Sequence, residues 1–366
     1  MKRVMIVMGT RPEAIKLCPL VRELRRRKAF ETLVCSTGQH REMLDRVLSA
    51  FSVIPDFNLA VMRKEQTLSE TVGRILLKTD ELLTLKKPDL VLVQGDTATA
   101  YAASAAAFYR HIPIGHVEAG LRTYHMQAPF PEEYHRQAIS LIADYHFAPT
   151  LHAKQNLIRE GKQEASIYVT GNTVVDAMRL TLGEKNPPIK WNFPADKRIL
   201  VFTAHRRESI GPSLYGMLRA LRKIVTEHAD VLAFFPVHQN PEVRRAAIEV
   251  LKGSPRIRMI DPLDIVSFHH LLANAYLILT DSGGIQEEAV SLGIPTLVMR
   301  YSSERTEGLR AGVLKLVGSG EAGIVEAANR LLKSDSEEYL AMKKPSAVFG
   351  DGNACVRIAD ILERMD

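Results

Sequence analysis

The sequence predicts an α/β protein built from two doubly wound, Rossmann-like domains with parallel sheets. Short apolar runs alternate with helical patterns along the whole chain, as expected for parallel strands that helices cover on both faces. The length of 366 residues and a hydrophobic content of 46% suffice for two cores. Motifs that combine glycine with charged residues follow many of the apolar runs, where parallel sheets bind ligands.

The apolar runs fall into two series. The first series predicts strands at residues 2–8, 31–37, 90–95, 112–117, 145–149 and 166–170. The second series predicts strands at residues 198–204, 231–237, 256–260, 276–280 and 295–299. Between the series, residues 184–197 are rich in proline and charge and contain Trp191, the only tryptophan. This segment is predicted to be the interdomain linker.

Composition indicates a soluble protein and is compatible with an anionic substrate. The net charge of +6, from 48 basic and 42 acidic residues, suits an anionic substrate but does not favour nucleic acid. The three cysteines form no CxxC motif and leave one unpaired, which indicates a reducing cytosol. The sequence has no signal-peptide pattern and no apolar run of membrane-spanning length. We expect a cytoplasmic protein without a membrane partner.

The segment TDSGGIQEEAVSLG, residues 280–293, predicts a nucleotide site. A buried strand precedes it, Ser282 is a typical N-cap residue, and Gly283 and Gly284 allow a ligand to approach the backbone. Free N–H groups at the start of the following helix suit a diphosphate. Glu288 lies one turn further on and is placed for the hydroxyls of a ribose, whereas Glu287 is interpreted as a surface residue. The alternative is an ordinary strand-to-helix turn whose glycines serve packing.

The segment GTRPEAIK, residues 9–16, predicts a polyphosphate site. It follows the first strand and opens the first helix, so Arg11 and Lys16 lie near a positive helix end. Neither GxGxxG nor GxxxxGK[ST] occurs in the chain, and no metal-ligand cluster is evident. We therefore expect turnover without NAD, metal or any other cofactor.

Further charged motifs follow strands in both halves of the chain. They contribute Asp96, His116, Glu118, Arg122, Glu132, Arg136, His205, Arg206, Arg207 and His238. Each of these residues also has an ordinary structural explanation, such as a surface pair of Glu132 with Arg136. The concentration of charged groups at one end of both predicted sheets nevertheless favours a shared active cleft between the domains.

Together these motifs resemble the non-hydrolysing UDP-N-acetylglucosamine 2-epimerases over nearly the whole chain. The resemblance rests on GTRPEAIK, QHREML, GDT, HVEAGLRT, PEE, TGNTVVDA, HRRES, PVHQNP, DSGGIQEE and GDGNAC, in that order. It implies a GT-B-like fold, with an N-terminal domain of residues 1–172 joined by a C-terminal helix at 353–366. Residues 173–352 then form the UDP-binding domain. The resemblance also implies interconversion of UDP-GlcNAc and UDP-ManNAc for bacterial surface polysaccharides, by a homodimer.

The resemblance assigns roles to individual residues. It implies acid–base roles for Asp96, Glu118 and Glu132, and a place for His205 in the active site. It implies UDP binding by Arg11, Lys16, Arg206, Leu263, Phe268, Ser282, Gly283, Gly284, Glu288 and Arg305. In related enzymes, positions matching Gln39, His40, Gln66 and His238 bind a second UDP-GlcNAc as an allosteric activator.

The chain departs from the family pattern at four positions that bear on these roles. The glycine that commonly follows GLRT is Tyr124, and the usual prolines of EAPSLG and TTERPE are Val290 and Thr306. The arginine that often precedes the activator-site glutamine is Glu65. These positions bear on sugar specificity and activator binding.

The chemistry of the reaction agrees with a division between cations and carboxylates. The hydrogen at C2 of the sugar is poorly acidic, so inversion without a redox cofactor requires another route. Expulsion of UDP with removal of the C2 proton gives a 2-acetamidoglucal, which is then protonated on the other face as UDP returns. A hydrolysing 2-epimerase, a GT-B glycosyltransferase and a nucleotide-sugar-binding regulatory protein are the alternatives.

Overall fold

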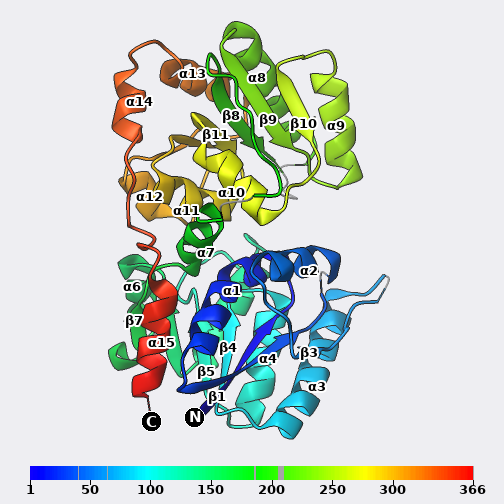
Figure 1. Ribbon diagram of the computed structural model, residues 1–366, viewed down its shortest axis with the longest axis vertical. Coiled ribbons are helices and arrows are strands. Elements are labelled where there is room, and N and C mark those ends of the chain that lie inside the picture. The colour runs from blue at the N-terminus through cyan, green and yellow to red at the C-terminus, as the bar shows by residue number, and fades with distance from the viewer. Residues whose placement is uncertain (40, 64, 185–186, 205–209, 366) are drawn as a thin grey trace. The chain divides into compact units, whose positions relative to one another are not determined.

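The computed structural model describes residues 1–39, 41–63, 65–184, 187–204 and 210–365. The chain forms two compact units, residues 1–180 with 350–366 and residues 181–349 (Figure 1). The division falls inside helix α7 (Thr173–Leu182), whereas the predicted boundary between residues 172 and 173 precedes that helix. Each unit is a Rossmann-like α/β domain with an all-parallel sheet, and the predicted fold class is confirmed.

The N-terminal unit contains a seven-stranded sheet in the order β3-β2-β1-β4-β5-β6-β7. Its elements are β1 (Lys2–Met8), α1 (Arg11–Arg26), β2 (Phe30–Ser36), α2 (Arg41–Ala50), β3 (Phe57–Asn58), α3 (Leu68–Lys86), β4 (Leu90–Gln94), α4 (Ala98–Tyr109), β5 (Ile114–Val117), α5 (Glu132–Ile142), β6 (Tyr145–Ala148), α6 (Leu151–Arg159), the 3-10 turn η1 (Glu164–Ser166), β7 (Ile167–Val169), most of α7, and α15 (Ala354–Arg364).

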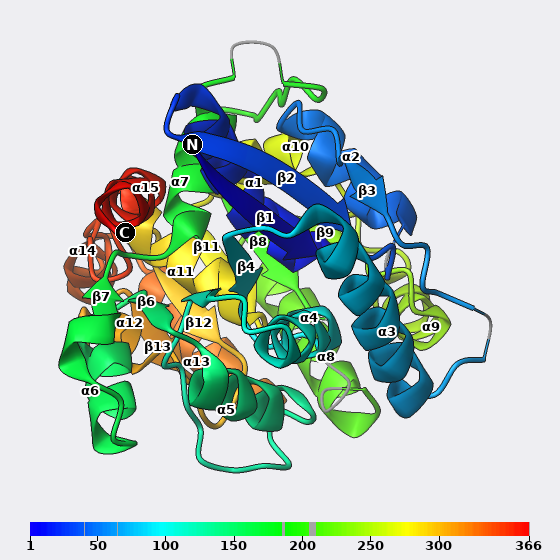
Figure 2. The ribbon, with the colours of Figure 1, turned by 90° about the horizontal axis from the view of Figure 1, so that it is seen from below.

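Strand β1 forms the centre of this sheet. Residues Val4 to Met8 are completely buried, as in strands covered by helices on both faces. Helices α1 and α2 lie on one face of the sheet, and α3, α4 and α5 lie on the other (Figure 2). The strand order reverses between β1 and β4, so the loops that follow these two strands diverge at the topological switch point. These loops contain the predicted motifs GTRPEAIK and GDT.

The C-terminal unit contains a six-stranded sheet in the order β10-β9-β8-β11-β12-β13. Its elements are the last residues of α7, β8 (Arg198–Thr203), α8 (Pro212–Glu227), β9 (Val231–Pro236), α9 (Pro241–Leu251), β10 (Ile257–Ile260), α10 (Ile265–Ala273), β11 (Leu277–Thr280), α11 (Gly283–Leu292), β12 (Thr296–Val298), α12 (Thr306–Arg310), β13 (Leu314–Leu316), α13 (Glu321–Leu331) and α14 (Glu337–Met342).

The switch point of the second sheet lies between β8 and β11. The loop after β11 opens helix α11, which carries the predicted nucleotide motif. The loop after β8 contains residues 205–209, which lie outside the described residues. Short edge strands β3 and β13 were not predicted, since runs of two and three residues carry little periodicity.

The predicted linker is part of the C-terminal unit. Trp191 stacks on Phe193 with ring centroids 5.6 Å apart, and both rings meet Phe234 edge-on. The Trp191 indole N–H donates to the Ser267 carbonyl at 3.0 Å. The linker interpretation is therefore wrong for this aromatic stretch, because its two partly buried rings pack against the sheet and hold the stretch in place.

Helix α15 belongs to the N-terminal unit although it ends the chain. The Asp176 carboxylate accepts the N–H groups of Ala354 and Cys355 at 3.2 and 2.9 Å, which satisfies donors at the start of the helix. Near its other end, Arg27 pairs with Asp360 at 2.6 Å. Across the described part of the chain, no helix is both long and apolar enough to cross a membrane.

Gly9, between β1 and α1, is required by packing. A Cβ atom at this position would lie 2.1 Å from the Thr37 hydroxyl oxygen and 2.2 Å from that of Thr99. These two hydroxyls are hydrogen bonded to each other at 3.0 Å and are buried. The loop at the switch point therefore contacts the loop after β2 and helix α4 without room for a side chain.

We expect Gly9→Ala to lower the free energy of unfolding by about 1–3 kcal/mol, the usual cost of overpacking. Urea denaturation of the purified variant measures the change. Gly73→Ala is the matched control, because Gly73 is exposed within α3 and a Cβ atom there meets nothing within 4 Å. The control should be neutral or slightly stabilising. Equal stability of the two variants would contradict the packing role of Gly9.

Candidate active site

The first part of the site is a buried ion pair between Lys16 and Glu118 in the N-terminal unit. Lys16 lies on α1, and Glu118 follows β5 with a left-handed backbone, φ +65°. The Gln94 amide, at the end of β4, donates to the same Glu118 oxygen at 2.7 Å. The sequence placed Lys16 in a purely cationic cluster, whereas the structure joins it to a predicted acid–base carboxylate.

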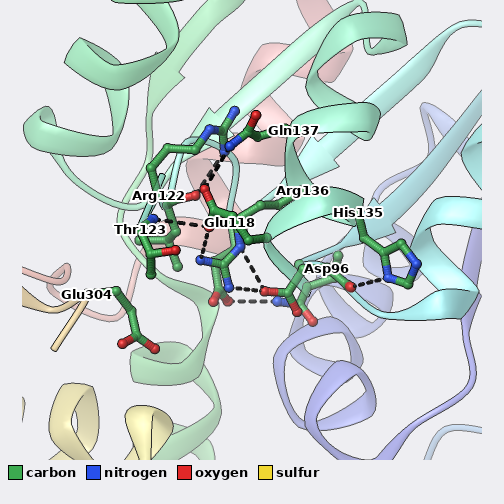
Figure 3. A network of polar contacts seen from close by, with 12 residues as sticks. Asp96, Glu118, Arg122, Thr123, His135, Arg136, Gln137 and Glu304 are labelled. Atoms are coloured by element: carbon green, nitrogen blue, oxygen red, sulfur yellow. Dashed lines mark hydrogen bonds and ion pairs between the residues drawn. The ribbon is translucent and has the colours of Figure 1, made fainter. Parts of the chain in front are cut away.

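A second pair joins Asp96, in the loop after β4, to Arg136 of α5 (Figure 3). The Arg136 Nε also donates to Asp96 Oδ2 at 3.1 Å, and His135 Nδ1 lies 2.9 Å from the Asp96 carbonyl oxygen. The Asp96 side chain is 25% exposed, compared with 6% for Glu118. Because β4 and β5 are neighbouring strands, both carboxylates lie at the same edge of the sheet.

Glu133 connects the loop after β5 to the Asp96–Arg136 pair. This fully buried carboxylate accepts the N–H groups of Thr123 and Tyr124, each at 3.0 Å, and lies 3.3 Å from Arg136 Nη1. Burial alone would raise the pKa of Glu133, but donors from Gln137 and the backbone, with the Arg136 charge, hold it below its ordinary value. Glu133 therefore remains ionised and fixes the positions of the loop after β5 and of Arg136.

His116 and Arg122 form buried hydrogen bonds that hold the structure around the site. The His116 Nε2 lies 2.7 Å from the Gly95 carbonyl oxygen, and burial lowers the pKa of this histidine to about 4. It is therefore neutral near pH 7 and fixes the turn before Asp96. The Arg122 guanidinium is buried and forms two bonds to Glu160, at 2.7 and 2.8 Å, and one to Ser140 at 2.8 Å.

The other predicted residues of this unit are partly exposed. Arg11 is the first residue of α1 and Glu132 the first of α5, and both are half-buried. Gln39 accepts the Thr99 hydroxyl at 3.0 Å, and Gln66 accepts the Arg63 N–H at 2.9 Å. His40 lies outside the described residues. Arg136 is paired with Asp96 and with Glu133.

The C-terminal unit presents the start of helix α11 as a candidate anion site. Ser282 is the N-cap, and Gly283 and Gly284 form the first turn, whose N–H groups lack carbonyl partners within the helix. A Cβ atom at Gly284 would meet nothing within 4 Å. Packing therefore does not require this glycine.

Two adjacent glutamates of α11 are both buried. Glu288, one turn beyond Gly284, lies with Oε1 3.3 Å from His269 Nε2. The surface interpretation of Glu287 is wrong, because it is fully buried and accepts Arg305 Nε at 3.0 Å. Arg305 also pairs with Glu304, so this arginine anchors the segment after β12 to α11.

The remaining predicted site residues belong to the C-terminal unit. Leu263 and Phe268 are half-buried against the apolar cluster beneath α10 and α11. His238 is exposed after β9, and its Nδ1 accepts the Asn240 N–H at 3.2 Å. His205 and Arg206 lie outside the described residues. Among the residues that are described, no group of three or more His, Cys, Asp and Glu side chains is arranged to hold a metal ion.

Sequence reasoning missed three residues that support the site: Glu13, Glu133 and His269. Glu13 is fully buried and accepts the N–H groups of Gly9 and Thr10 at 3.0 and 2.7 Å, together with the Thr97 hydroxyl at 2.7 Å. Its spacing from Thr10 is a capping-box signal that could have identified it. The roles of Glu133 and His269 depend on partners far away in the sequence.

Two Rossmann-like parallel sheets with charged groups at their strand ends define a GT-B-like protein. The profile of the UDP-N-acetylglucosamine 2-epimerase family matches residues 22–363. The chain is 50% identical to UDP-N-acetylglucosamine 2-epimerase of Bacillus subtilis over 361 residues, covering 98% of this chain and 94% of that protein. The chain therefore belongs to the UDP-N-acetylglucosamine 2-epimerase family.

Solved structures show the same likeness. UDP-GlcNAc 2-epimerase from Neisseria meningitidis, crystallised with UDP-GlcNAc, is 39% identical with a TM-score of 0.93 over 99% of this chain and all of that one. The Methanocaldococcus jannaschii enzyme, crystallised with UDP-GlcNAc and UDP, is 33% identical with a TM-score of 0.85 over 99% of each chain.

We expect Glu133→Gln to lower the free energy of unfolding by about 1.5–3 kcal/mol, because it removes the charge that accepts two backbone N–H groups and lies beside Arg136, which keeps its pair with Asp96. Urea denaturation checks this value. Glu164→Gln serves as the control, since Glu164 pairs with Lys154 at the surface and its side chain is 72% exposed. A Glu133→Gln variant as stable as this control would show that the buried carboxylate is dispensable.

Proposed function

We propose that this protein is a non-hydrolysing UDP-N-acetylglucosamine 2-epimerase, which interconverts UDP-GlcNAc and UDP-ManNAc. Family membership supports the substrate. The observation that carries the non-hydrolysing reaction is the presence of two carboxylates, Asp96 and Glu118, at neighbouring strand ends, each beside its own cation. Inversion at C2 needs a base on one face of the sugar and an acid on the other.

The reaction starts with breakage of the bond between C1 of the sugar and the diphosphate oxygen. UDP leaves with the bonding electrons, and a carboxylate takes the proton from C2, so that a C1–C2 double bond forms. In the second half, a protein acid protonates C2 on the opposite face and UDP adds back to C1. Atoms and charge balance without an oxidant, and water does not enter the product.

We assign the diphosphate to the start of helix α11 and the ribose to Glu288. Backbone N–H groups and the helix dipole stabilise the charge that develops on the departing UDP. The open space at Gly284 supports close contact with a phosphate oxygen. Asp96, Glu118 and Glu132 are assigned to the sugar. The partial exposure of Asp96 supports exchange of its proton with water between the two halves of the reaction.

We expect UDP-GlcNAc incubated with the enzyme in heavy water to give UDP-ManNAc with one deuterium at C2. Mass spectrometry and proton NMR identify the product and the labelled position. Positional isotope exchange of the oxygen that bridges C1 and the β-phosphate tests whether that bond breaks. Both signals are expected, because the proton removed by one carboxylate is replaced by an exchanged proton from another.

Three results distinguish the alternatives. Free ManNAc with UDP, formed without UDP-ManNAc, would identify a hydrolysing enzyme. Binding of UDP-GlcNAc without any product would indicate a regulatory protein or a transferase that lacks its acceptor. UDP-ManNAc without C2 deuterium would contradict elimination and re-addition.

We expect Asp96→Asn to lower kcat by at least about a hundredfold while the affinity for UDP changes little, because the loss of one acid–base group affects the transition state. We expect Glu288→Ala to weaken UDP binding, since its carboxylate is assigned to the ribose. Steady-state kinetics and calorimetry with UDP separate these effects. The assignment is reversed if the Asn variant loses UDP affinity and the Ala variant keeps it.

A further inference from the structure

A chain of three buried polar side chains leads to Glu288 within the C-terminal unit. The Thr181 hydroxyl, on the last turn of α7, lies 2.6 Å from His269 Nδ1 on α10. The His269 Nε2 then lies 3.3 Å from Glu288 Oε1 on α11, a close contact that falls short of hydrogen-bond geometry, so this buried nitrogen has no hydrogen-bond partner among the described residues. His269 is completely buried, and Thr181 and Glu288 are 3% and 6% exposed. Side chains from three helices therefore form one buried row that ends at the Glu288 carboxylate.

The chemistry of these groups sets the direction of the chain. A carboxylate oxygen repels the lone pair of a nitrogen 3.3 Å away, so this contact favours the tautomer of His269 with its hydrogen on Nε2. In the neutral imidazole, Nδ1 is then an acceptor, and the Thr181 hydroxyl donates to it. Thr181 thereby fixes the orientation of the ring and its tautomer. This is the relationship by which an outer residue holds a histidine in place for its acceptor.

The other oxygen of Glu288 is left for a ligand. Glu288 Oε2 is buried and has no hydrogen-bond partner among the described residues. A buried carboxylate oxygen without a donor is costly, because it has lost its hydration. A pair of vicinal hydroxyls would supply the missing donors. The buried, unpartnered Oε2 lies one helical turn beyond the first turn of α11, the candidate diphosphate site.

We propose that His269, braced by Thr181, is a positioning residue that holds Glu288 for the ribose hydroxyls and so determines the preference for ribonucleotides. The inference rests on the proposed UDP site. It assigns no contact between His269 and the ligand, because His269 acts through the Glu288 carboxylate.

The alternative is that His269 only fills space in the core beneath α10 and α11. Substitution would then lower stability and weaken all nucleotides alike. A positioning role has a different signature, since it affects only ligands that carry the hydroxyls. Comparison of UDP with 2′,3′-dideoxy-UDP therefore separates the two roles.

The experiment measures the dissociation constants of both nucleotides by calorimetry for the wild-type protein and its variants. The wild type should bind UDP more tightly than 2′,3′-dideoxy-UDP. We expect His269→Phe to weaken the binding of UDP by about tenfold, because Glu288 loses the polar contact that holds its carboxylate, and to leave the binding of the dideoxy compound nearly unchanged. Thr181→Val should show a smaller loss of the same kind.

His270→Phe is the matched control, because it makes the same substitution one residue further along α10. The structure gives no contact of His270 with Glu288, and the control should keep the wild-type preference. His269→Gln retains an N–H donor of similar reach and should restore part of the UDP affinity. If His269→Phe does not fold, the comparison of the two nucleotides is made with His269→Gln.

The outcomes separate this inference from the proposed function. If the wild type fails to bind UDP, the proposed function and the inference both fail. If the wild type binds UDP but does not prefer it over the dideoxy compound, only the inference is overturned. The inference is also overturned if His269→Phe and His269→Gln lose affinity equally for both nucleotides. The same holds if no substitution at His269 or Thr181 weakens UDP binding.

Discussion

Burial of carboxylates near the start of helices holds the loops at the carboxyl ends of both sheets. A buried charge is tolerated only where donors satisfy it, so each such carboxylate dictates the positions of the backbone and cations around it. Glu13 orders the loop between β1 and α1 and reaches Thr97 in the next loop. Glu133 orders the loop after β5, and Glu287 anchors Arg305. The loops that carry the proposed catalytic and binding residues inherit their geometry from these bonds.

This arrangement also determines which charges can act on the substrate. Lys16 faces Glu118, so it does not form with Arg11 the purely cationic cluster that the sequence predicts. Arg136 and Arg305 also face carboxylates. In the N-terminal unit, a carboxylate beside a cation suits proton transfer at a sugar carbon. In the described part of the C-terminal unit, the start of α11 supplies partial positive charge from the backbone. In the proposed mechanism, these dipoles stabilise the negative charge of the leaving diphosphate, and no side chain has to move.

The sequence was sufficient to predict features whose signal is local. Buried parallel strands are continuous apolar runs, and the motifs that follow them lie at the carboxyl ends by topology alone. Features that depend on distant partners were missed. Glu287 and Glu288 are adjacent and chemically identical, and only the positions of Arg305 and His269 show that both are buried and paired. Trp191 lies among prolines and charges typical of a linker, yet its ring packs on Phe193 and Phe234.

Three of the four departures from the family pattern can be understood from the local backbone. Thr306 begins α12, where the N–H group has no helical partner in any case, so proline and threonine both suit the position. Val290 lies inside α11, where its N–H can join a regular helix that a proline would interrupt. Tyr124 is different, because it has φ +58° in place of the usual glycine. Such a conformation costs about 1 kcal/mol or more for a side chain other than glycine. Glu133 accepts the Tyr124 N–H at 3.0 Å, so the same carboxylate that supports Arg136 also holds this strained residue in the loop that carries Glu118.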